Sequence, residues 1–412
     1  MKTALHLLLL AVVGLTSATF PASTPSMITY WGQNRGVRVI GDEAKQEPTL
    51  AQICDLPQFS VVVLSFMMEH FSVKGDPGLD FSKWCGAEKN TYSGYSLTGA
   101  GSTMLNCPQI GTWITYCQSL GKTVLLGIRP QAALKSESQG EASADKVWNI
   151  FLGGSSSVKP FGAGVKLDGV DFLVRNNDNV GYSSMIRILR QNMIGDSSKS
   201  YYMSVSPTCD YVIESSFLMQ PVIVARKTDL DWINVFFLAS SSCTWTKNRA
   251  GFWNNFDMWA SQAASWNLKM FMTTVGVGYD GFEAYVDGMN GDFIYPFEMQ
   301  TQNVMGTMKT KPAFGGITLF DSSFESINPC IATNQSYSAI IYEQLSGSPA
   351  VTGNNTVTKC ILKPNLFPRR AVKNTTDTAT GDPLESWAFA MTLETSFIGL
   401  AILSGVFVYG LI

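Results

Sequence analysis

Short and almost continuous apolar runs recur along most of this chain, and segments with a helical pattern separate them. A continuous apolar run of this length is typical of a parallel strand that is buried on both faces. Eight runs can be marked, at residues 27–31, 60–67, 123–128, 170–174, 201–206, 232–238, 270–277 and 317–320. Helical segments at 114–120 and 253–266 lie between them. The alternation predicts an α/β protein built on a parallel sheet.

Two architectures fit this alternation. Eight strand–helix units can close into a (β/α)8 TIM barrel, and the same order of elements can form an open, doubly wound sheet. The chain has 412 residues, enough to bury one large core and still carry a tail. The alternation does not reveal the order of the strands in space, so both architectures stay open on this ground alone.

The most unusual run is the stretch 167–175, which reads Leu-Asp-Gly-Val-Asp-Phe-Leu-Val-Arg. Val170, Phe172 and Val174 are β-branched or aromatic, as a buried strand requires. Asp171 interrupts them, and a charge inside a barrel is costly unless it has a role or a partner. The stretch is therefore the first place to look for a functional site.

This stretch resembles the fourth-strand signature of glycoside hydrolase family 18, Asp-Gly-x-Asp-x-Asp-x-Glu. The run Tyr-Trp-Gly-Gln-Asn at 30–34 is similar to the opening strand of class III chitinases, the plant and fungal branch of that family. The resemblance implies the (β/α)8 TIM barrel rather than the open sheet, and we place the barrel domain at 25–345.

The resemblance also implies how such a site works. In the family the N-acetyl oxygen of the substrate attacks the anomeric carbon, and the protein supplies a proton-donating Glu, an orienting Asp and a Tyr hydroxyl. The matching positions here are Arg175, Leu173 and Leu238. An arginine keeps its proton at neutral pH and cannot act as the acid. The resemblance therefore predicts a chain with no catalytic residues, in which these three positions are degenerate.

Other family positions are partly kept. On the resemblance, Tyr30, Gln33 and Asn34 match the sugar-binding end, Asp171 matches the inner carboxylate, and Phe320 stands where the family has a Trp. These five are the predicted ligand-binding residues. Burial in the core is the ordinary alternative for an aromatic such as Tyr30.

The spacing of Asp171 and Arg175 adds a further expectation. The two residues are four positions apart, so an extended strand presents both on one face. They could form a salt bridge that fills the old site, or a clamp for a ligand, and the sequence does not choose between these.

A different carboxylate could replace the missing acid. Asp178, Asp210, Asp280 and Asp321 follow predicted strands and could lie at the barrel mouth, where catalytic residues of such barrels sit. The alternative is that they are solvated loop acids.

The eight cysteines are interpreted from the same resemblance. The family pattern implies three bridges, which are Cys54–Cys117, Cys85–Cys107 and Cys209–Cys243. Cys330 and Cys360 are left over and are expected to pair, because a secreted chain meets an oxidising compartment. Two free thiols are the alternative.

Both ends of the chain predict export. Lys2 precedes an apolar run at 5–15 and small residues at 16–18, the pattern of a signal peptide, which we place at 1–22. The apolar run is too short for a membrane-spanning helix.

After the barrel the composition becomes polar, and we expect a glycosylated stalk at 346–386. Asn-x-Ser/Thr sequences begin at Asn334, Asn354 and Asn374, and such sites accept glycans on exposed loops. The tail at 387–412 is largely apolar and no positive charge follows it, which favours a glycosylphosphatidylinositol anchor signal. A retained membrane span is the alternative.

The remaining composition restricts the partners. The only two histidines, His6 and His70, exclude a multi-histidine metal site, and we expect neither metal nor cofactor. A net charge of −3 gives no reason to expect nucleic acid.

We therefore expect a monomeric, surface-anchored, inactive chitinase-like protein. It would bind chitin or chito-oligosaccharides, or act at the cell wall, on the extracellular face of the plasma membrane. One alternative is a diverged chitinase that still hydrolyses β-1,4-linked N-acetylglucosamine polymers. The other is a protein-interaction module, because a fold does not fix a function.

Overall fold

The computed structural model describes residues 25–34, 47–72, 75–81, 84–85, 104–130, 132–174, 180–210, 219–237, 242–245, 247–275, 294, 299, 302–324 and 335–347. The strands are β1 (Ser26–Trp31), β2 (Phe59–Glu69), β3 (Gly78–Leu79), β4 (Thr123–Ile128), β5 (Gly169–Phe172), β6 (Tyr202–Val205), β7 (Trp232–Phe236), β8 (Lys269–Thr274) and β9 (Phe314–Leu319). The helices are α2 (Leu50–Asp55), α3 (Pro108–Ser119), α4 (Glu137–Phe151), α5 (Val180–Gly195), α6 (Gln220–Arg226), the 3-10 turn η1 (Lys227–Asp229), α7 (Arg249–Ser265), α10 (Val304–Lys309) and α12 (Tyr337–Ser346).

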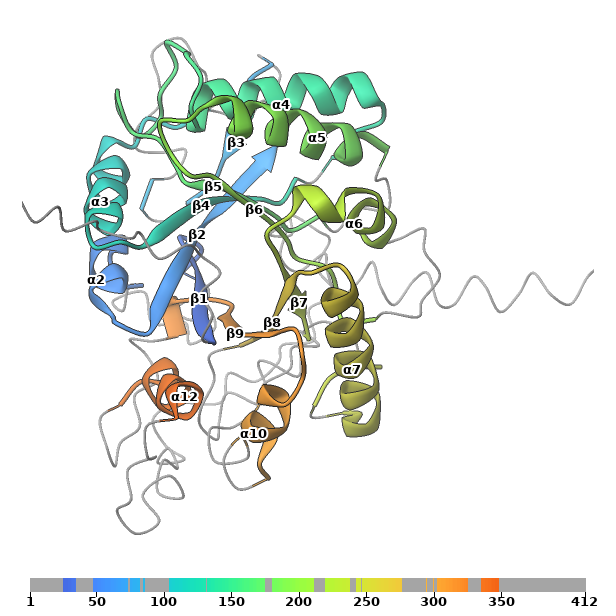
Figure 1. Ribbon diagram of the computed structural model, residues 1–412. Coiled ribbons are helices and arrows are strands. Elements are labelled where there is room, and N and C mark those ends of the chain that lie inside the picture. Colours follow the sequence, from blue (N-terminus) through green and yellow to red (C-terminus); the bar gives the residue numbers. More distant parts are fainter. Residues whose placement is uncertain are drawn as a thin grey trace, which may run out of the picture.

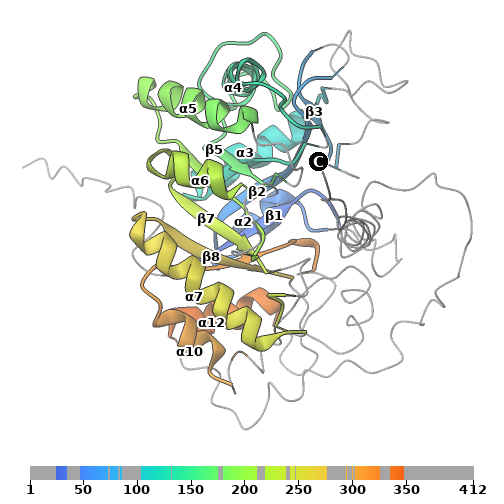
Figure 2. The ribbon, with the colours of Figure 1, turned by 90° about the vertical axis from the view of Figure 1, so that its right-hand side faces the viewer.

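The strands close into a barrel with helices outside it (Figure 1). The sheet has nine strands in the order β1-β9-β8-β7-β6-β5-β4-β2-β3, and β1 also pairs with β2. All strands except the short β3 therefore form a closed ring, and the pairings within the ring are parallel. The predicted (β/α)8 TIM barrel is confirmed, and the open sheet is excluded. Figure 2 shows α5, α6 and α7 on the outside of the strands.

The last strand begins earlier than the sequence pattern predicts, at Phe314 rather than Ile317. The reason is that Gly316 belongs to the strand and not to a turn before it. Its φ is +141°, and an added Cβ would lie 1.8 Å from the backbone oxygen of Ser26. Glycine is needed there because β1 approaches the backbone of β9 too closely for a side chain.

Helix α7 also begins earlier than predicted, at Arg249 rather than at 253. Asn248 precedes it, and its side chain accepts a hydrogen bond from the backbone N–H of Gly251. An asparagine at this position satisfies one of the unpaired N–H groups that open a helix. The extra turn matters because it places Arg249 on the outer face of the barrel next to α10.

Two apolar layers hold the barrel, and β5 shows how they are divided. Val170, Phe172 and Val174 belong to the outer layer between the strands and the helices. Leu173 belongs to the inner layer, which fills the barrel. Alternate residues of a strand point to opposite faces, so Asp171 faces the inside as well.

The first carboxylate of the signature, Asp168, lies at the other end of β5. Its Oδ2 accepts hydrogen bonds from the backbone N–H of Val124 (2.7 Å) and from Nε2 of Gln118 (3.1 Å). Its Oδ1 lies 2.8 Å from Nζ of Lys199. Asp168 therefore joins α3 to the starts of β4 and β5, far from the carboxyl ends of the strands.

The three disulfides implied by the family pattern are confirmed, because Cys54–Cys117, Cys85–Cys107 and Cys209–Cys243 are all bonded. Cys330 and Cys360 lie outside the described residues, so their pairing stays a prediction.

The predicted signal peptide at 1–22 and the anchor signal at 387–412 also lie outside the described residues, as do Asn334, Asn354 and Asn374. Of the predicted stalk at 346–386 the structure describes Ser346, which ends α12, and Gly347. Within the part of the chain that the structure describes, no helix combines the length and the hydropathy needed to cross a membrane.

Candidate functional site

Asp171 is at the centre of a hydrogen-bond network inside the barrel. Its side chain is completely buried. Its Oδ2 accepts a hydrogen bond from the Tyr30 hydroxyl at 2.7 Å. Its Oδ1 accepts from Ser204 Oγ at 2.6 Å and Ser206 Oγ at 2.8 Å. The amide Nδ2 of Asn234 also donates to Oδ1, at 3.1 Å. Donors from three strands, β1, β6 and β7, or from residues next to them, thus converge on one carboxylate of β5.

The network extends one step further round the barrel. Thr318 of β9 donates a hydrogen bond from Oγ1 to Oδ1 of Asn234, at 3.1 Å. This contact orients the amide so that its NH2 group points at Asp171. Removal from water raises the pKa of Asp171, and the hydrogen bonds from Ser204 and Tyr30 oppose that rise. The carboxylate is therefore built into the barrel interior.

The predicted partner of Asp171 lies outside the description. Arg175 is within 175–179, which the structure does not describe, so neither the salt bridge nor the ligand clamp is tested. Asp171 does not need Arg175 to compensate its burial, because four donors already bind its two oxygens. Its assignment as a ligand-binding residue stays a prediction.

Leu173 lies where the family has its orienting carboxylate, and it is in an apolar environment. Its side chain is 1% exposed and belongs to the inner layer. The same layer contains four aromatic residues near the carboxyl ends of the strands, Tyr30, Phe66, Phe236 and Phe320. We call these four residues the aromatic plug. A leucine in this layer offers a sugar no hydrogen bond.

The aromatic plug is held together by ring contacts centred on Phe320. Its ring centroid lies 5.1 Å from that of Tyr30 and 5.4 Å from that of Phe236, both at steep interplanar angles. It lies 6.2 Å from Phe66 in a stacked arrangement. The guanidinium carbon of Arg129 lies 5.6 Å from the centroid of the Phe66 ring, where a cation is attracted to the ring face. All four rings are buried. Phe320 therefore packs in the barrel interior, and its predicted contact with a ligand stays a prediction.

Gln33 and Asn34 follow β1 at the barrel mouth and are both buried. Gln33 Nε2 donates to the backbone oxygens of Ser65 (2.8 Å) and Asp80 (3.1 Å). Asn34 Oδ1 accepts from the backbone N–H of Glu47 at 2.8 Å. These side chains join loops around the mouth, and their predicted contact with a saccharide stays untested.

Glu47 is a residue of the mouth that the sequence analysis missed. It is 1% exposed. Its Oε2 accepts from the backbone N–H groups of Gly32 and Asn34, each at 3.1 Å, and its Oε1 accepts from Ser322 Oγ at 2.6 Å. Burial, followed by the negative charge of nearby Asp321, raises the pKa of Glu47 from 4.5 to about 8. Nothing in the local sequence marks this glutamate, which precedes a proline in a polar loop.

We expect Glu47 to make the protein less stable as the pH rises. Between pH 4.5 and about 8 its carboxyl group is protonated in the folded protein and ionised in the unfolded chain. In this range the folded state binds more protons than the unfolded chain. The contribution of Glu47 to the free energy of unfolding is therefore complete below pH 4.5 and is lost as the pH rises through about 8. Glu47→Gln should flatten this fall in the free energy of unfolding. Urea unfolding at several pH values above about 6.5 measures it.

The pH series starts at about 6.5 so that the titration of His70 does not contribute to the measured slope. Burial lowers the pKa of His70 from 6.5 to about 3, so its own effect on stability is complete above pH 6.5. The matched control is Glu137→Gln, an exposed glutamate in the first turn of α4, which should keep the wild-type slope. An unchanged slope in Glu47→Gln would contradict the expectation.

The imidazole of His70 is buried among hydroxyl groups. Its Nδ1 lies 2.7 Å from Ser143 Oγ and its Nε2 lies 2.9 Å from the Tyr182 hydroxyl, so both ring nitrogens bind hydroxyl groups inside the fold. Among the described residues, the one cluster with metal-ligating side chains is Cys209, Asp210 and Cys243. Its two sulfurs form a disulfide with each other, so they are not thiolate ligands.

Two of the four possible substitute acids are described. Asp321 is buried beside Glu47, and its Oδ1 accepts from the backbone N–H of Ser323 at 3.1 Å. Asp210 follows β6, is partly exposed, and accepts a hydrogen bond from Ser242. Asp178 and Asp280 lie outside the described residues. Asp210 is thus the better placed of the two described acids to meet a solvent-borne substrate.

The catalytic Tyr position of the family falls at Leu238, which also lies outside the described residues. The degenerate role of Arg175 and Leu238 therefore stays a prediction from the resemblance, and for Leu173 the structure adds its burial in the inner apolar layer.

Comparison with known proteins finds fungal chitinases among the relatives. Chitinase 1 of Candida albicans is 30% identical over 381 residues, which cover 90% of this chain and 69% of that protein. Endochitinase 3 of Metarhizium anisopliae is 30% identical over 273 residues, which cover 64% of this chain and 83% of that protein. A scan against models of protein families finds no match.

Solved structures share the barrel. A chitinase from Ipomoea carnea superposes with a TM-score of 0.58 at 21% identity and covers 77% of this chain and 99% of its own. A chitinase-like lectin from tamarind gives 0.54 at 19% identity, with the same coverage of 77% and 99%. At these identities the likeness concerns the fold.

Proposed function

The chain belongs to the chitinases of glycoside hydrolase family 18, and from that premise we propose that it binds chitin-type oligosaccharides without hydrolysing them. The observation that carries the proposal is the buried position of Leu173 in the inner apolar layer. At the matching position of the family signature, an Asp carboxylate orients the N-acetyl group of the substrate. A leucine packed there cannot orient that group, so the substrate-assisted reaction lacks its first requirement.

The sequence adds two further losses. Arg175 stands where the family has its acid, and Leu238 where it has its Tyr. A general acid contributes a factor of about 10²–10⁴ to a rate, and each hydrogen bond to the transition state about 10²–10³. Even with overlap between these contributions, little hydrolysis should remain.

Binding can survive where catalysis is lost. Catalysis depends on a few groups at one sugar subsite, whereas affinity comes from contacts spread along several. In a barrel of this kind those contacts come from the loops at the carboxyl ends of the strands. Gln33 and Asn34 begin one such loop, and their side chains join it to its neighbours at the mouth.

A glycan array probed with the purified protein tests the ligand class. We expect retention of N-acetylglucosamine oligomers, with longer oligomers retained better than the disaccharide because the contacts are spread out. If the array retained no glycan, the proposal would be contradicted, and the protein-interaction module would become the favoured function.

The diverged chitinase remains the second candidate function, and Asp210 is the observation that favours it. Asp210 is the partly exposed acid at the end of β6. If Asp210 were a relocated acid, purified protein would hydrolyse a chitin oligomer, and Asp210→Asn would abolish that activity.

We also propose that the mature protein is secreted, glycosylated and held on the outer face of the plasma membrane by a lipid. The proposal rests on the apolar run at 5–15, on the Asn-x-Ser/Thr sequences at Asn334, Asn354 and Asn374, and on the largely apolar segment at 387–412 after a polar spacer, which is the composition of a lipid-anchor signal. A phospholipase specific for phosphatidylinositol should release the protein from membranes. Resistance to this enzyme, with a peptide from the tail detected in the mature protein, would favour a membrane-spanning helix.

A further inference from the structure

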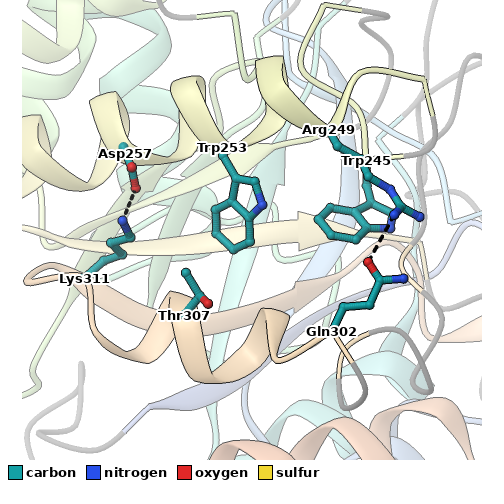
Figure 3. A pocket seen from close by; sticks show the side chains of 7 residues that line it. All are labelled: Trp245, Arg249, Trp253, Asp257, Gln302, Thr307 and Lys311. Carbon is teal, nitrogen blue, oxygen red and sulfur yellow. Dashed lines mark hydrogen bonds and ion pairs between the residues drawn. The ribbon is translucent and has the colours of Figure 1, made fainter.

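A groove of about 440 Å³ lies on the outer wall of the barrel, between α7 and α10 (Figure 3). Helix α7 contributes Arg249, Trp253 and Asp257 to it. Residues four apart share one face of a helix, and eight residues of helix extend for about 12 Å. The groove is therefore longer than one sugar ring, and none of its lining residues belongs to the aromatic plug.

An indole stands in the middle of the groove. Figure 3 shows Trp253 between Arg249 at one end and Asp257 at the other, with its ring directed toward α10. The ring is partly exposed. Edge contacts with Trp245 (6.2 Å between centroids) and Phe256 (5.8 Å) fix its orientation. The groove thus contains an apolar ring whose orientation is set by its neighbours and which is partly accessible to a ligand.

Hydrogen-bonding groups flank the indole on both sides. At one end, the guanidinium carbon of Arg249 lies 4.6 Å from the Trp245 ring centroid, and its Nη1 donates to Gln302 Oε1 at 3.1 Å. At the other end, Lys311 Nζ lies 2.5 Å from Asp257 Oδ1. These mutual contacts hold four polar side chains in place along the rim of the groove.

The charge of the groove favours an uncharged ligand. Asp257 and Lys311 neutralise each other as an ion pair, and Arg249 is the other charged residue that lines the groove. A site for an anionic ligand would concentrate cations of the same sign to attract it. Here the two cations are at opposite ends, and one of them is already paired.

We propose that this groove is a second binding site, and that it takes an uncharged oligosaccharide. A pyranose ring has an apolar C–H face that can pack on an indole, and hydroxyl groups around its edge that can exchange hydrogen bonds with amide, guanidinium, hydroxyl and carboxylate groups. The groove presents these two kinds of surface in that arrangement. Its volume is also within the range of ligand sites, roughly 300–1,000 Å³. The inference does not depend on binding at the barrel mouth.

Fluorine NMR of the full chain labelled with 5-fluorotryptophan tests the proposal directly. The probes are a hexamer of N-acetylglucosamine and a hexamer of β-1,3-linked glucose. The Trp253 resonance is identified by its absence from Trp253→Ala. We expect it to shift saturably with at least one probe, while the resonance of Trp266 stays unchanged. Trp266 is a matched control, because it caps the same helix and is also partly buried, but does not line the groove.

A second variant guards against misfolding of Trp253→Ala. Thr307→Lys places a long side chain in the groove from α10 without removing any ring contact, and it should weaken saturation of the Trp253 resonance at least tenfold. Trp266→Ala should leave that saturation unchanged. The proposal is overturned if neither probe moves the Trp253 resonance at about 10 mM, or if Thr307→Lys leaves the affinity unchanged.

Discussion

Asp171→Ala is expected to lower the free energy of unfolding by at least about 3 kcal/mol, because a buried donor left without its acceptor costs about 1–3 kcal/mol. The carboxylate accepts from Tyr30, Ser204, Ser206 and Asn234 inside the barrel. In a packed interior these donors cannot turn to bulk water once the carboxylate is removed, so each unpaired donor costs free energy. The total free energy of unfolding of a natural protein is only about 5–15 kcal/mol. The variant should therefore unfold at a markedly lower urea concentration or fail to accumulate.

Two matched variants separate this network from a general effect of losing an aspartate. Tyr30→Phe removes one donor and keeps the ring contacts of the plug, so it should cost about 1 kcal/mol. Asp145→Ala removes an exposed carboxylate of α4 and should stay within about 0.5 kcal/mol of the wild type. Urea unfolding with the disulfides intact measures all three. A loss below about 1 kcal/mol for Asp171→Ala would show that the network does not support the barrel.

No release of shorter oligomers from a chitin hexamer is expected from the purified protein. On the family resemblance, the positions of the orienting carboxylate, the acid and the Tyr are occupied by Leu173, Arg175 and Leu238. Restoring all three, as Leu173→Asp, Arg175→Glu and Leu238→Tyr, should give detectable turnover. Arg175→Glu alone should give none, because a general acid cannot act on an N-acetyl group that nothing orients. Chromatography of the products over time is the measurement.

The restored variant needs a test of its fold, since Leu173→Asp introduces a carboxyl group into the inner apolar layer beside Asp171. Retained cooperative unfolding shows that the barrel tolerates the change. Clear turnover by the unmodified protein would contradict the expectation, and its loss in Asp210→Asn would identify the relocated acid.

The sequence predicted the strands because apolar runs, and the alternation of side chains between the two faces of a strand, are local patterns. The alternation of residues along 170–174 correctly divides the outward Val170 and Phe172 from the inward Asp171 and Leu173. The closed topology did not follow from that pattern and needed the family resemblance. The early start of β9 was missed because a glycine pair looks the same in a turn and at a crowded strand contact.

The interior of the site was not predictable in the same way. Tyr30 and Asp171 are 141 positions apart in the sequence, and Glu47 and Ser322 are 275 apart. No periodicity connects such pairs, because only the closure of the barrel brings them together. A charge that is costly inside a barrel correctly indicated that Asp171 has partners, but not which ones. Glu47 carried no such indication.

Calorimetric titration of the purified protein with a chitin hexamer tests binding without hydrolysis most directly. We expect a saturable isotherm in the micromolar to millimolar range, roughly −8 to −4 kcal/mol, which persists in Trp253→Ala, where the outer groove cannot contribute. The heat should return to the baseline after every injection, because no bond is cleaved. Absence of heat at millimolar hexamer would contradict binding, and a steady heat that continues after each injection would contradict the loss of hydrolysis.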